Sequence, residues 1–411
     1  MRIVDLFAGC GGLSKGFEDA GFQIVAAFEF WDKAAECYAL NFSHPVFTTD
    51  LSDTTTAVDE IQKFHPDIII GGPPCQDFSH AGKRVEGSRA GLTEAYAEII
   101  RAVRPKYFVM ENVDRARNSH AFREAHAVFK KLEYGLTMMV LDASRCGVPQ
   151  KRKRFFCIGE LGGADDFLHE RLLAGQTTTD MTLRDYFGAA LDFEFYYRHP
   201  RNYCRRAVYS IDEPAPTMRG VNRPVPKGYP GHPNDACPID ENVRALTTLE
   251  RSLIQTFPAD YHWCGSKTDM EQMVGNDVPV KLGEYVARAL KEHIEQKKIL
   301  YERPVELAFH FAETGFRQDF SEWLVERKCY ARRTAGDMAS RVKRAHSIRL
   351  MDAGEETVLY LHHLSQCPQF QELSSSIRSQ LKRAVALYGE YLRATSYDCT
   401  EESPRCSAHP S

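Results

Sequence analysis

The chain has 411 residues, of which 43% are hydrophobic and 26% are charged, and its formal net charge is −4 at pH 7. This composition is typical of a soluble globular protein, and the length predicts two or three domains. The net charge excludes a uniformly basic nucleic-acid binder, so a nucleic-acid partner has to be bound by local basic stretches. No apolar run reaches membrane-spanning length, so we expect no membrane association and a cytoplasmic location.

The twelve cysteines are scattered singly along the chain, and no Cys-x-x-Cys pair occurs. The spacing therefore predicts neither a metal site nor a disulfide framework. A reducing compartment fits this pattern and would keep a reactive thiol free.

Short apolar runs alternate with amphipathic stretches over residues 1–164. The helical patterns include 33–40 and 95–103, and the apolar runs are 3–7, 24–28, 67–70, 107–110, 138–141 and 154–158. This alternation predicts an α/β fold with a doubly wound, mostly parallel, Rossmann-like sheet.

A glycine-rich loop follows the first predicted strand and opens a helix. Glycines let the backbone turn sharply and approach a ligand closely, and a helix N-terminus favours a carboxylate or phosphate. The loop alone fits any nucleotide-type cofactor, but it also fits a tight turn without a ligand. The candidate cofactor contacts here are Phe7, Gly9, Gly11, Gly12 and Leu13.

Acidic and aromatic residues end the next two predicted strands. Glu29 is placed to accept hydrogen bonds from ribose hydroxyls, and Phe30 and Trp31 follow it. Trp31 is suited either to cover an adenine face or to pack in the core. After a third short strand, Asp50-Leu51 offers a carboxylate for an adenine amino group. The ordered series of loop, acid, aromatic and Asp favours a cofactor site.

Two prolines precede Cys75 directly after the predicted strand at 67–70. A lone cysteine is usually a small buried hydrophobe, but this one is held rigidly at a strand end, where open α/β sheets bind ligands. Glu111 ends the neighbouring strand, so its carboxylate is expected beside the group that Cys75 attacks.

A basic block, Gln150-Lys151-Arg152-Lys153-Arg154, precedes the strand at 154–158. Strand alternation places Gln150, Arg152 and Arg154 on one face and the two lysines on the other. A solvated basic turn is the competing interpretation.

Taken together and in this order, the blocks resemble the DNA cytosine-5 methyltransferase family of the bacterial restriction-modification type. The matching residues are the loop from Asp5 to Gly12, Glu29 with Trp31, Asp50, Pro73-Pro74-Cys75-Gln76, Glu111-Asn112-Val113, Gln150-x-Arg152-x-Arg154 and Gly275-Asn276-Asp277-Val278-Pro279. The combination is specific and covers residues 1–295. In the last block Asp277 replaces the family's usual serine, and we expect backbone contacts to tolerate this change.

The resemblance implies a reaction and a cofactor. Methyl would pass from S-adenosylmethionine, leaving S-adenosylhomocysteine, to carbon 5 of a flipped-out cytosine, while the Cys75 thiolate adds to carbon 6. Glu111 would protonate or hydrogen-bond N3, Arg154 would hold O2, and Arg152 would order the loop around Cys75 and Glu111. The base that removes the carbon-5 proton is not identified by the sequence. Pro73, Asn276 and Val278 would complete the cofactor site.

The same resemblance assigns residues 165–242 to a loop-rich target-recognition domain and 243–298 to helices that complete the catalytic domain. Double-stranded DNA is the implied partner, a cognate restriction endonuclease is the expected functional companion, and we expect a monomer associated with the nucleoid. Arginines read guanine or bind phosphates. The candidate DNA contacts are Gln76, Ser79, Arg89, Arg198, Arg205, Arg206, Thr217, Arg219 and Arg223.

Residues 299–411 lie outside the shared blocks and predict a helical extension with a strongly basic stretch from Arg327 to Arg349. DNA contact and a structural or docking role both remain open for it. Two rival functions remain as well. A tRNA methyltransferase of the same superfamily would carry a Cys-Phe-Thr motif, which is absent from the sequence, and a non-enzymatic DNA reader would lack some catalytic residue.

Overall fold

The computed structural model describes residues 1–74, 91–202, 204–302, 316–350 and 357–398. The chain divides into two compact units. The first consists of Met1–Leu132, Leu136–Leu161 and Leu168–Ile294, and the second of Glu133–Gly135, Gly162–Phe167 and Glu295–Ser411. The division at residue 294 falls four residues before the predicted start of the extension, inside one continuous helix.

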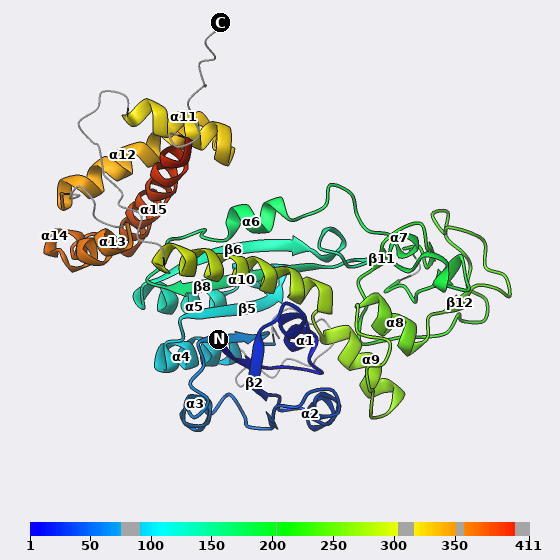
Figure 1. The fold of residues 1–411 in the computed structure, drawn as a ribbon. Helices are drawn as coiled ribbons and strands as arrows, with labels where there is room; N and C mark the ends of the chain where they lie inside the picture. Colours follow the sequence, from blue (N-terminus) through cyan, green and yellow to red (C-terminus); the bar gives the residue numbers. More distant parts are fainter. Residues whose placement is uncertain (75–90, 203, 303–315, 351–356, 399–411) are drawn as a thin grey trace, which may run out of the picture. The chain divides into compact units, whose positions relative to one another are not determined.

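A seven-stranded sheet forms the centre of the first unit (Figure 1). Neighbouring strands are parallel from β3 to β5, whereas β8 runs antiparallel to β5. This confirms the predicted mostly parallel sheet. In spatial order the strands are β3 (Val46–Phe47), β2 (Gln23–Phe28), β1 (Arg2–Leu6), β4 (Ile68–Gly71), β5 (Tyr107–Val113), β8 (Lys153–Leu161) and β6 (Tyr134–Asp142).

The central strands are continuous apolar runs because helices cover both faces of the sheet. Ile68, Ile69 and Ile70 of β4 are completely buried. Right-handed crossovers place helices on opposite faces when the chain reverses direction across a sheet. The helices of the outward path from β1 to β3 therefore lie on one face, and those of the return path to β6 lie on the other.

The helices of the outward path are α1 (Gly12–Asp19) and α2 (Asp32–Ala39). The return path contributes α3 (Thr54–Gln62), α4 (Gly91–Val103) and α5 (His120–Lys131), which pack side by side. Helix α10 (Val280–Glu302) lies against α1, because a side chain at Gly16 would meet the backbone of Val280 and Gly283. The short 3-10 helices are η2 (Asp114–Asn118), η3 (Ala143–Arg145) and η4 (Gly188–Ala190).

The direction of the strand order reverses between β1 and β4. Chains leaving these two strands diverge at their carboxyl ends, and open α/β sheets bind ligands in the crevice that results. The glycine loop leaves β1 and the Pro73-Pro74 segment leaves β4 at this point.

The segment between β8 and α10 is mostly irregular up to residue 247, where helix α8 follows. A three-stranded sheet in this segment has two buried clusters, one around Tyr196 and one around Tyr197, which are consecutive residues of one strand and so face opposite sides. The elements of the segment are α6 (His169–Ala174), α7 (Leu183–Phe187), β9 (Phe195–Tyr197), β10 (Val208–Ser210), β11 (Ala215–Pro216), β12 (Arg244–Ala245), α8 (Thr248–Ile254) and α9 (Lys267–Asn276). Strand β11 pairs with β7 (Gln150–Lys151), which precedes β8 in the chain.

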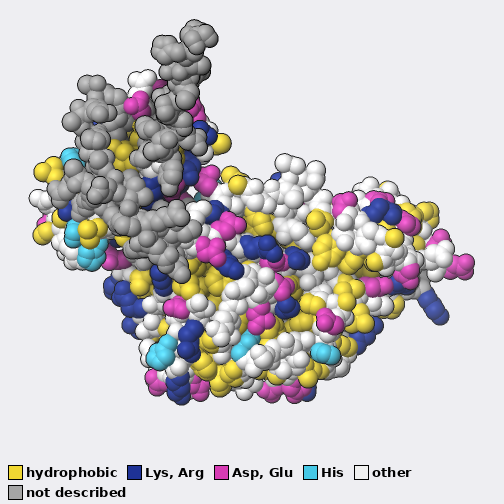
Figure 2. Space-filling model, viewed as in Figure 1, with side chains coloured by type: hydrophobic (Ala, Val, Ile, Leu, Met, Phe, Trp, Pro, Cys, Tyr) yellow, Lys and Arg dark blue, Asp and Glu magenta, His cyan; other side chains and the backbone are white. Residues whose placement is uncertain are grey.

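The second unit is helical and has a separate hydrophobic core built around Phe320, Met338, Tyr360 and Tyr388. No helix in the described ranges is long and apolar enough to cross a membrane. On the face seen in Figure 2, acidic and basic side chains are interspersed. The helices of this unit are α11 (Phe316–Lys328), α12 (Arg332–Ile348), α13 (Thr357–Gln366), α14 (Pro368–Gln371) and α15 (Ser375–Asp398).

Candidate active site

A cavity of about 1050 Å³ opens at the carboxyl ends of β1 and β4. It brings together blocks that are far apart in the sequence, including both candidate cofactor and candidate catalytic residues. The wall contains Phe7, Gly9, Leu13, Glu29, Phe30, Trp31, Asp50, Leu51, Pro73, Glu111, Arg154, Asn276 and Val278.

The Glu29 carboxylate is fixed between the glycine loop and the start of α2. Its Oε2 accepts a hydrogen bond from the Gly9 backbone at 2.8 Å, and its Oε1 accepts one from the Trp31 backbone at 2.7 Å. Burial nevertheless raises the pKa of Glu29. Trp31 packs against a hydrophobic core, as one interpretation of it predicts, and it also lines the cavity. Its contact with an adenine face stays a prediction.

Gly11 and Gly12, two of the candidate cofactor contacts, do not line the cavity. A Cβ at Gly11 would lie 2.4 Å from the Phe42 ring, and one at Gly12 would lie 2.2 Å from the Val278 carbonyl oxygen. Gly11 also adopts a φ of 100°, which side-chain-bearing residues rarely adopt. These two glycines are thus required by packing of the loop against the protein itself.

The Asp277 side chain accepts hydrogen bonds from the glycine loop. Its Oδ2 accepts hydrogen bonds from the Cys10 backbone at 3.0 Å and from the Cys10 thiol at 2.9 Å, while its Oδ1 accepts from the Gly12 backbone at 3.1 Å and from Val278 at 2.8 Å. The helix N-terminus that was expected to favour a ligand carboxylate is therefore occupied by a carboxylate of the protein.

The expectation that backbone contacts tolerate Asp277 stays a prediction, but it gave no role to the Asp277 side chain. Sequence reasoning missed the contact, although the departure from the family's usual serine was a signal for it. A second missed residue is Asp5, which lines the cavity and is 1% exposed. Its Oδ2 accepts from the Ser14 hydroxyl at 2.7 Å, and burial raises the pKa of Asp5 to about 8.

Glu111 and Arg154 form a buried ion pair at the edge of the cavity. The antiparallel register sets Val113 opposite Arg154, so Glu111, two residues earlier, is a diagonal neighbour on the same face. Arg154 Nε lies 2.8 Å from Glu111 Oε1, but the two atoms are not aligned as a hydrogen bond. Burial raises the pKa of Glu111, and Arg154 opposes that rise.

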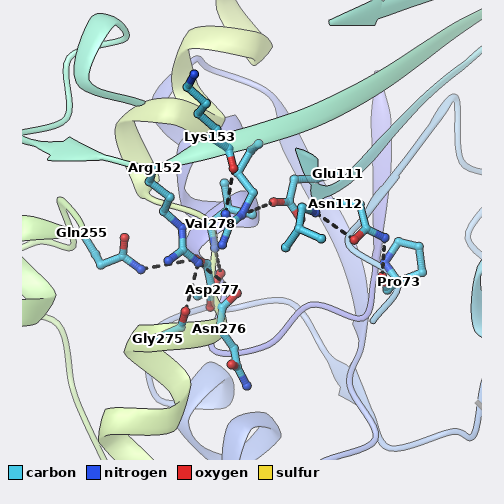
Figure 3. A network of polar contacts seen from close by, with 12 residues as sticks. Pro73, Glu111, Asn112, Arg152, Lys153, Gln255, Gly275, Asn276, Asp277 and Val278 are labelled. Atoms are coloured by element: carbon cyan, nitrogen blue, oxygen red, sulfur yellow. Dashed lines mark hydrogen bonds and ion pairs between the residues drawn. The ribbon is translucent and has the colours of Figure 1, made fainter. Parts of the chain in front are cut away.

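Asn112 connects this carboxylate to the segment that leads to Cys75. Its side-chain amide donates to the Pro73 carbonyl at 2.9 Å (Figure 3). A Cβ at Gly72 would lie 3.0 Å from Glu111 Oε2, so the backbone before Cys75 runs close to the Glu111 carboxylate. The predicted residues Cys75, Gln76, Ser79 and Arg89 lie outside the described residues.

Arg152 is 1% exposed and binds backbone carbonyl groups. Its guanidinium donates to Met218 at 3.0 Å, to Gly275 at 3.0 Å and to Asp277 at 2.8 Å. These contacts fix the last block of the catalytic domain against the segment at Met218, a role that the resemblance does not assign to Arg152. Its predicted role around Cys75 and Glu111 stays a prediction, because Cys75 lies outside the described residues. Figure 3 shows Arg152 beside Gly275, Asn276 and Asp277, with Glu111 nearby.

The alternation predicted for the basic block is confirmed. Gln150 and Arg152 are buried and Arg154 is largely so, whereas Lys151 and Lys153 are exposed, which excludes a solvated turn. The Gln150 side chain donates to Gln255 at 2.7 Å and accepts from the Met218 backbone at 2.8 Å.

A family model described as C-5 cytosine-specific DNA methylase matches residues 1–292. The chain belongs to this family. It is 55% identical over 292 residues to the Type II methyltransferase M.HindV of Haemophilus influenzae, a match that covers 71% of this chain and 96% of the relative. It is 50% identical over 300 residues to M.HgiDI of Herpetosiphon aurantiacus, covering 73% and 97%.

Solved structures of other methyltransferases have the same fold as this DNA (cytosine-5-)-methyltransferase. The S. pombe Dnmt2 methyltransferase has a TM-score of 0.55 at 20% identity, and the match covers 72% of this chain and 99% of that one. A putative DNA modification methyltransferase from an E. coli prophage has a TM-score of 0.53 at 20% identity, and the match covers 72% of this chain and 99% of that one. Both matches leave more than a quarter of this chain uncovered.

Three of the methyltransferase's candidate DNA-contacting arginines bind protein groups in this structure. Arg198 donates to the Thr217 carbonyl at 2.6 Å, Arg206 forms a bidentate pair with Glu213, and Arg219 donates to a backbone carbonyl. These guanidinium groups stabilise an irregular domain that has little regular backbone pairing of its own.

Two predicted arginines, Arg205 and Arg223, remain exposed and have no hydrogen-bond or ion-pair partner among the described residues. The DNA contacts of these five arginines stay predictions. The Thr217 hydroxyl donates to the Lys151 carbonyl at 2.7 Å, so this part of the domain is fastened to the basic block of the methyltransferase. Within the described residues, no group of three or more His, Cys, Asp or Glu side chains is arranged to hold a metal ion.

Proposed function

We propose that the enzyme transfers a methyl group from S-adenosylmethionine to carbon 5 of a flipped-out cytosine in a specific double-stranded DNA sequence, through a covalent adduct with Cys75. The observation that carries this proposal is the single cavity that joins Glu29, Trp31 and Asp50 to the buried Glu111–Arg154 pair. Its volume is large enough for a nucleoside cofactor and a base.

The residues present fit S-adenosylmethionine, which supplies an electrophilic methyl group when bound. Each Glu29 oxygen accepts one backbone hydrogen bond and has a further acceptor position for a ribose hydroxyl. Trp31 offers an aromatic face, and Asp50 offers an acceptor for an amino group. Asp5 and Asp277 supply acidic groups at the glycine loop.

Cytosine carbon 5 becomes nucleophilic when the Cys75 thiolate adds to carbon 6, because the new bond converts the ring to an enamine. Glu111 is suited to protonate N3 as charge develops, since its buried carboxyl has a raised pKa. Arg154 pairs with that carboxylate and lines the cavity, which supports its assignment to the ring O2. After methyl transfer, loss of the carbon-5 proton expels the thiolate and regenerates the enzyme.

The relatives are named Type II methyltransferases, which supports a role in a restriction-modification system. In that role, methylation protects host DNA from a cognate endonuclease. We further propose that the enzyme acts as a cytoplasmic monomer on chromosomal DNA.

The deciding experiment is bisulfite sequencing of host DNA after expression of the wild type and of Cys75→Ala. The wild type should methylate one sequence, and Cys75→Ala should methylate none while still binding DNA, because flipping does not require the thiol. DNA with 5-fluorocytosine at the target should trap a covalent adduct only with the wild type. A normal rate from Cys75→Ala, or methylation of tRNA instead of DNA, would overturn the proposal.

A further inference from the structure

The helical extension is additional to the shared catalytic chain. The family model ends at residue 292, and the match to M.HindV already covers 96% of that relative. Residues 295–411 therefore form a part of this chain that has no counterpart in the match to this relative. Their helices α11 to α15 build a separate core, so the unit presents surfaces of its own.

Helix α12 has one buried face and one strongly basic face. The buried face packs into the core through Ala335, Met338, Ala339, Val342 and Ala345. At 100° per residue, the opposite arc of roughly 120° has two basic edges with small residues between them. This basic face consists of Arg332, Arg333, Lys343 and Arg344, with Gly336, Ser340 and Ser347 along its centre.

The four cations of the basic face are exposed, and none has an ion-pair or hydrogen-bond partner among the described residues. Other cations of the unit are engaged, since Lys328 pairs with Glu390 at 2.8 Å and Arg383 with Asp166 at 3.0 Å. From residue 332 to 349 the sequence has six arginines or lysines against one acidic residue, Asp337, which lies at the edge of the face.

The shape of the basic face suits an extended polyanion. Arg332 and Lys343 form one edge and Arg333 and Arg344 the other, and the two ends are about 16 Å apart along the axis. A Cβ at Gly336 would meet nothing within 4 Å, so the centre of the helix is open to close approach. Positive charges spaced along an open helix can contact several phosphates of one strand.

We propose that the basic face of α12 binds the phosphate backbone of DNA without reading its sequence. The inference rests on the proposed action on double-stranded DNA, which brings a polyanion to an enzyme whose net charge is −4. Such contacts release counterions, so they strengthen binding most at low salt. The extension thereby holds the enzyme on DNA, while target choice stays with the catalytic unit.

The test compares two double variants of the full chain. Arg333→Gln/Arg344→Gln removes two charges from the basic face, and Lys63→Gln/Lys131→Gln removes two exposed charges at the ends of α3 and α5. DNA affinity is measured against salt concentration for the wild type and both variants. Loss of two phosphate contacts should flatten the log–log slope by about 1.8 in the first variant, and the control should keep the wild-type slope.

Target sequence and turnover at saturating DNA should be unchanged in both variants. Unchanged slopes in an active enzyme would overturn the inference and assign the face to another role. Equal flattening in both variants would overturn it too, because the effect would then be one of net charge. A wild type that methylates no DNA would instead overturn the proposed function, so the two failures are distinguishable.

Discussion

Replacement of Asp277 by asparagine should loosen the glycine loop and weaken binding of S-adenosylmethionine. In the wild type, one carboxylate oxygen accepts from Gly12 and Val278 and the other from Cys10. Asparagine has a single side-chain oxygen, so its amide nitrogen must face one of these N–H groups. The Cys10 N–H is the one that loses its acceptor when the amide oxygen stays with the other two.

An unpaired buried N–H group costs about 1–3 kcal/mol. Because Gly9 and Cys10 line the cavity, a large part of this cost should appear in cofactor affinity, as a rise in Kd of roughly 5- to 150-fold. Isothermal titration with S-adenosylmethionine measures it directly, and the thermal midpoint should fall in parallel.

Cys10→Ala is the matched control, since it removes the thiol contact to Asp277 and keeps the backbone N–H. It should leave cofactor affinity near that of the wild type. Asp277→Asn with unchanged affinity and stability would refute the reasoning, as would an equal loss in Cys10→Ala, because the thiol and not the loop backbone would then be the important partner.

Three further variants test single groups of the cavity. Glu111→Gln keeps the shape of the side chain but not its acid, so turnover should fall by roughly 10²–10⁴ while cofactor affinity is retained; a larger loss of affinity than of rate would contradict its place beside the target base. Glu29→Ala should weaken the binding of S-adenosylmethionine by about 1–3 kcal/mol and leave DNA affinity in the absence of cofactor unchanged; weaker binding of both ligands would indicate a folding defect. Burial raises the pKa of Asp5 from 3.8 to about 8. Between these two pH values the folded state keeps a proton on Asp5 that the unfolded state has lost. The free energy of unfolding should therefore fall by about 1.4 kcal/mol per pH unit as pH rises. Asp5→Asn should flatten this dependence in thermal melts between pH 5 and roughly 8, and an unchanged profile would show that Asp5 is ionised in the fold.

The sequence by itself determined the order of strands and helices in the catalytic unit and the blocks that meet in the cavity. Both depend on local patterns. A strand such as Ile68–Gly71 is apolar throughout because both of its faces are covered, and a motif directly after a strand is carried to the sheet's carboxyl edge. Alternation likewise fixed the directions of Gln150, Arg152 and Arg154, because a strand has a period of two.

Only the tertiary structure decided which groups these residues bind. Asp277 meets Cys10 across 267 positions of sequence, and Arg152 meets Asp277 across 125. No local period encodes such a contact, because it depends on how α10 and the preceding turn pack against the first loop. The same holds for Arg206, whose pairing with Glu213 in its own domain no local pattern predicts. A sequence gives a side chain its chemistry, whereas packing selects the one partner that satisfies it once water is excluded.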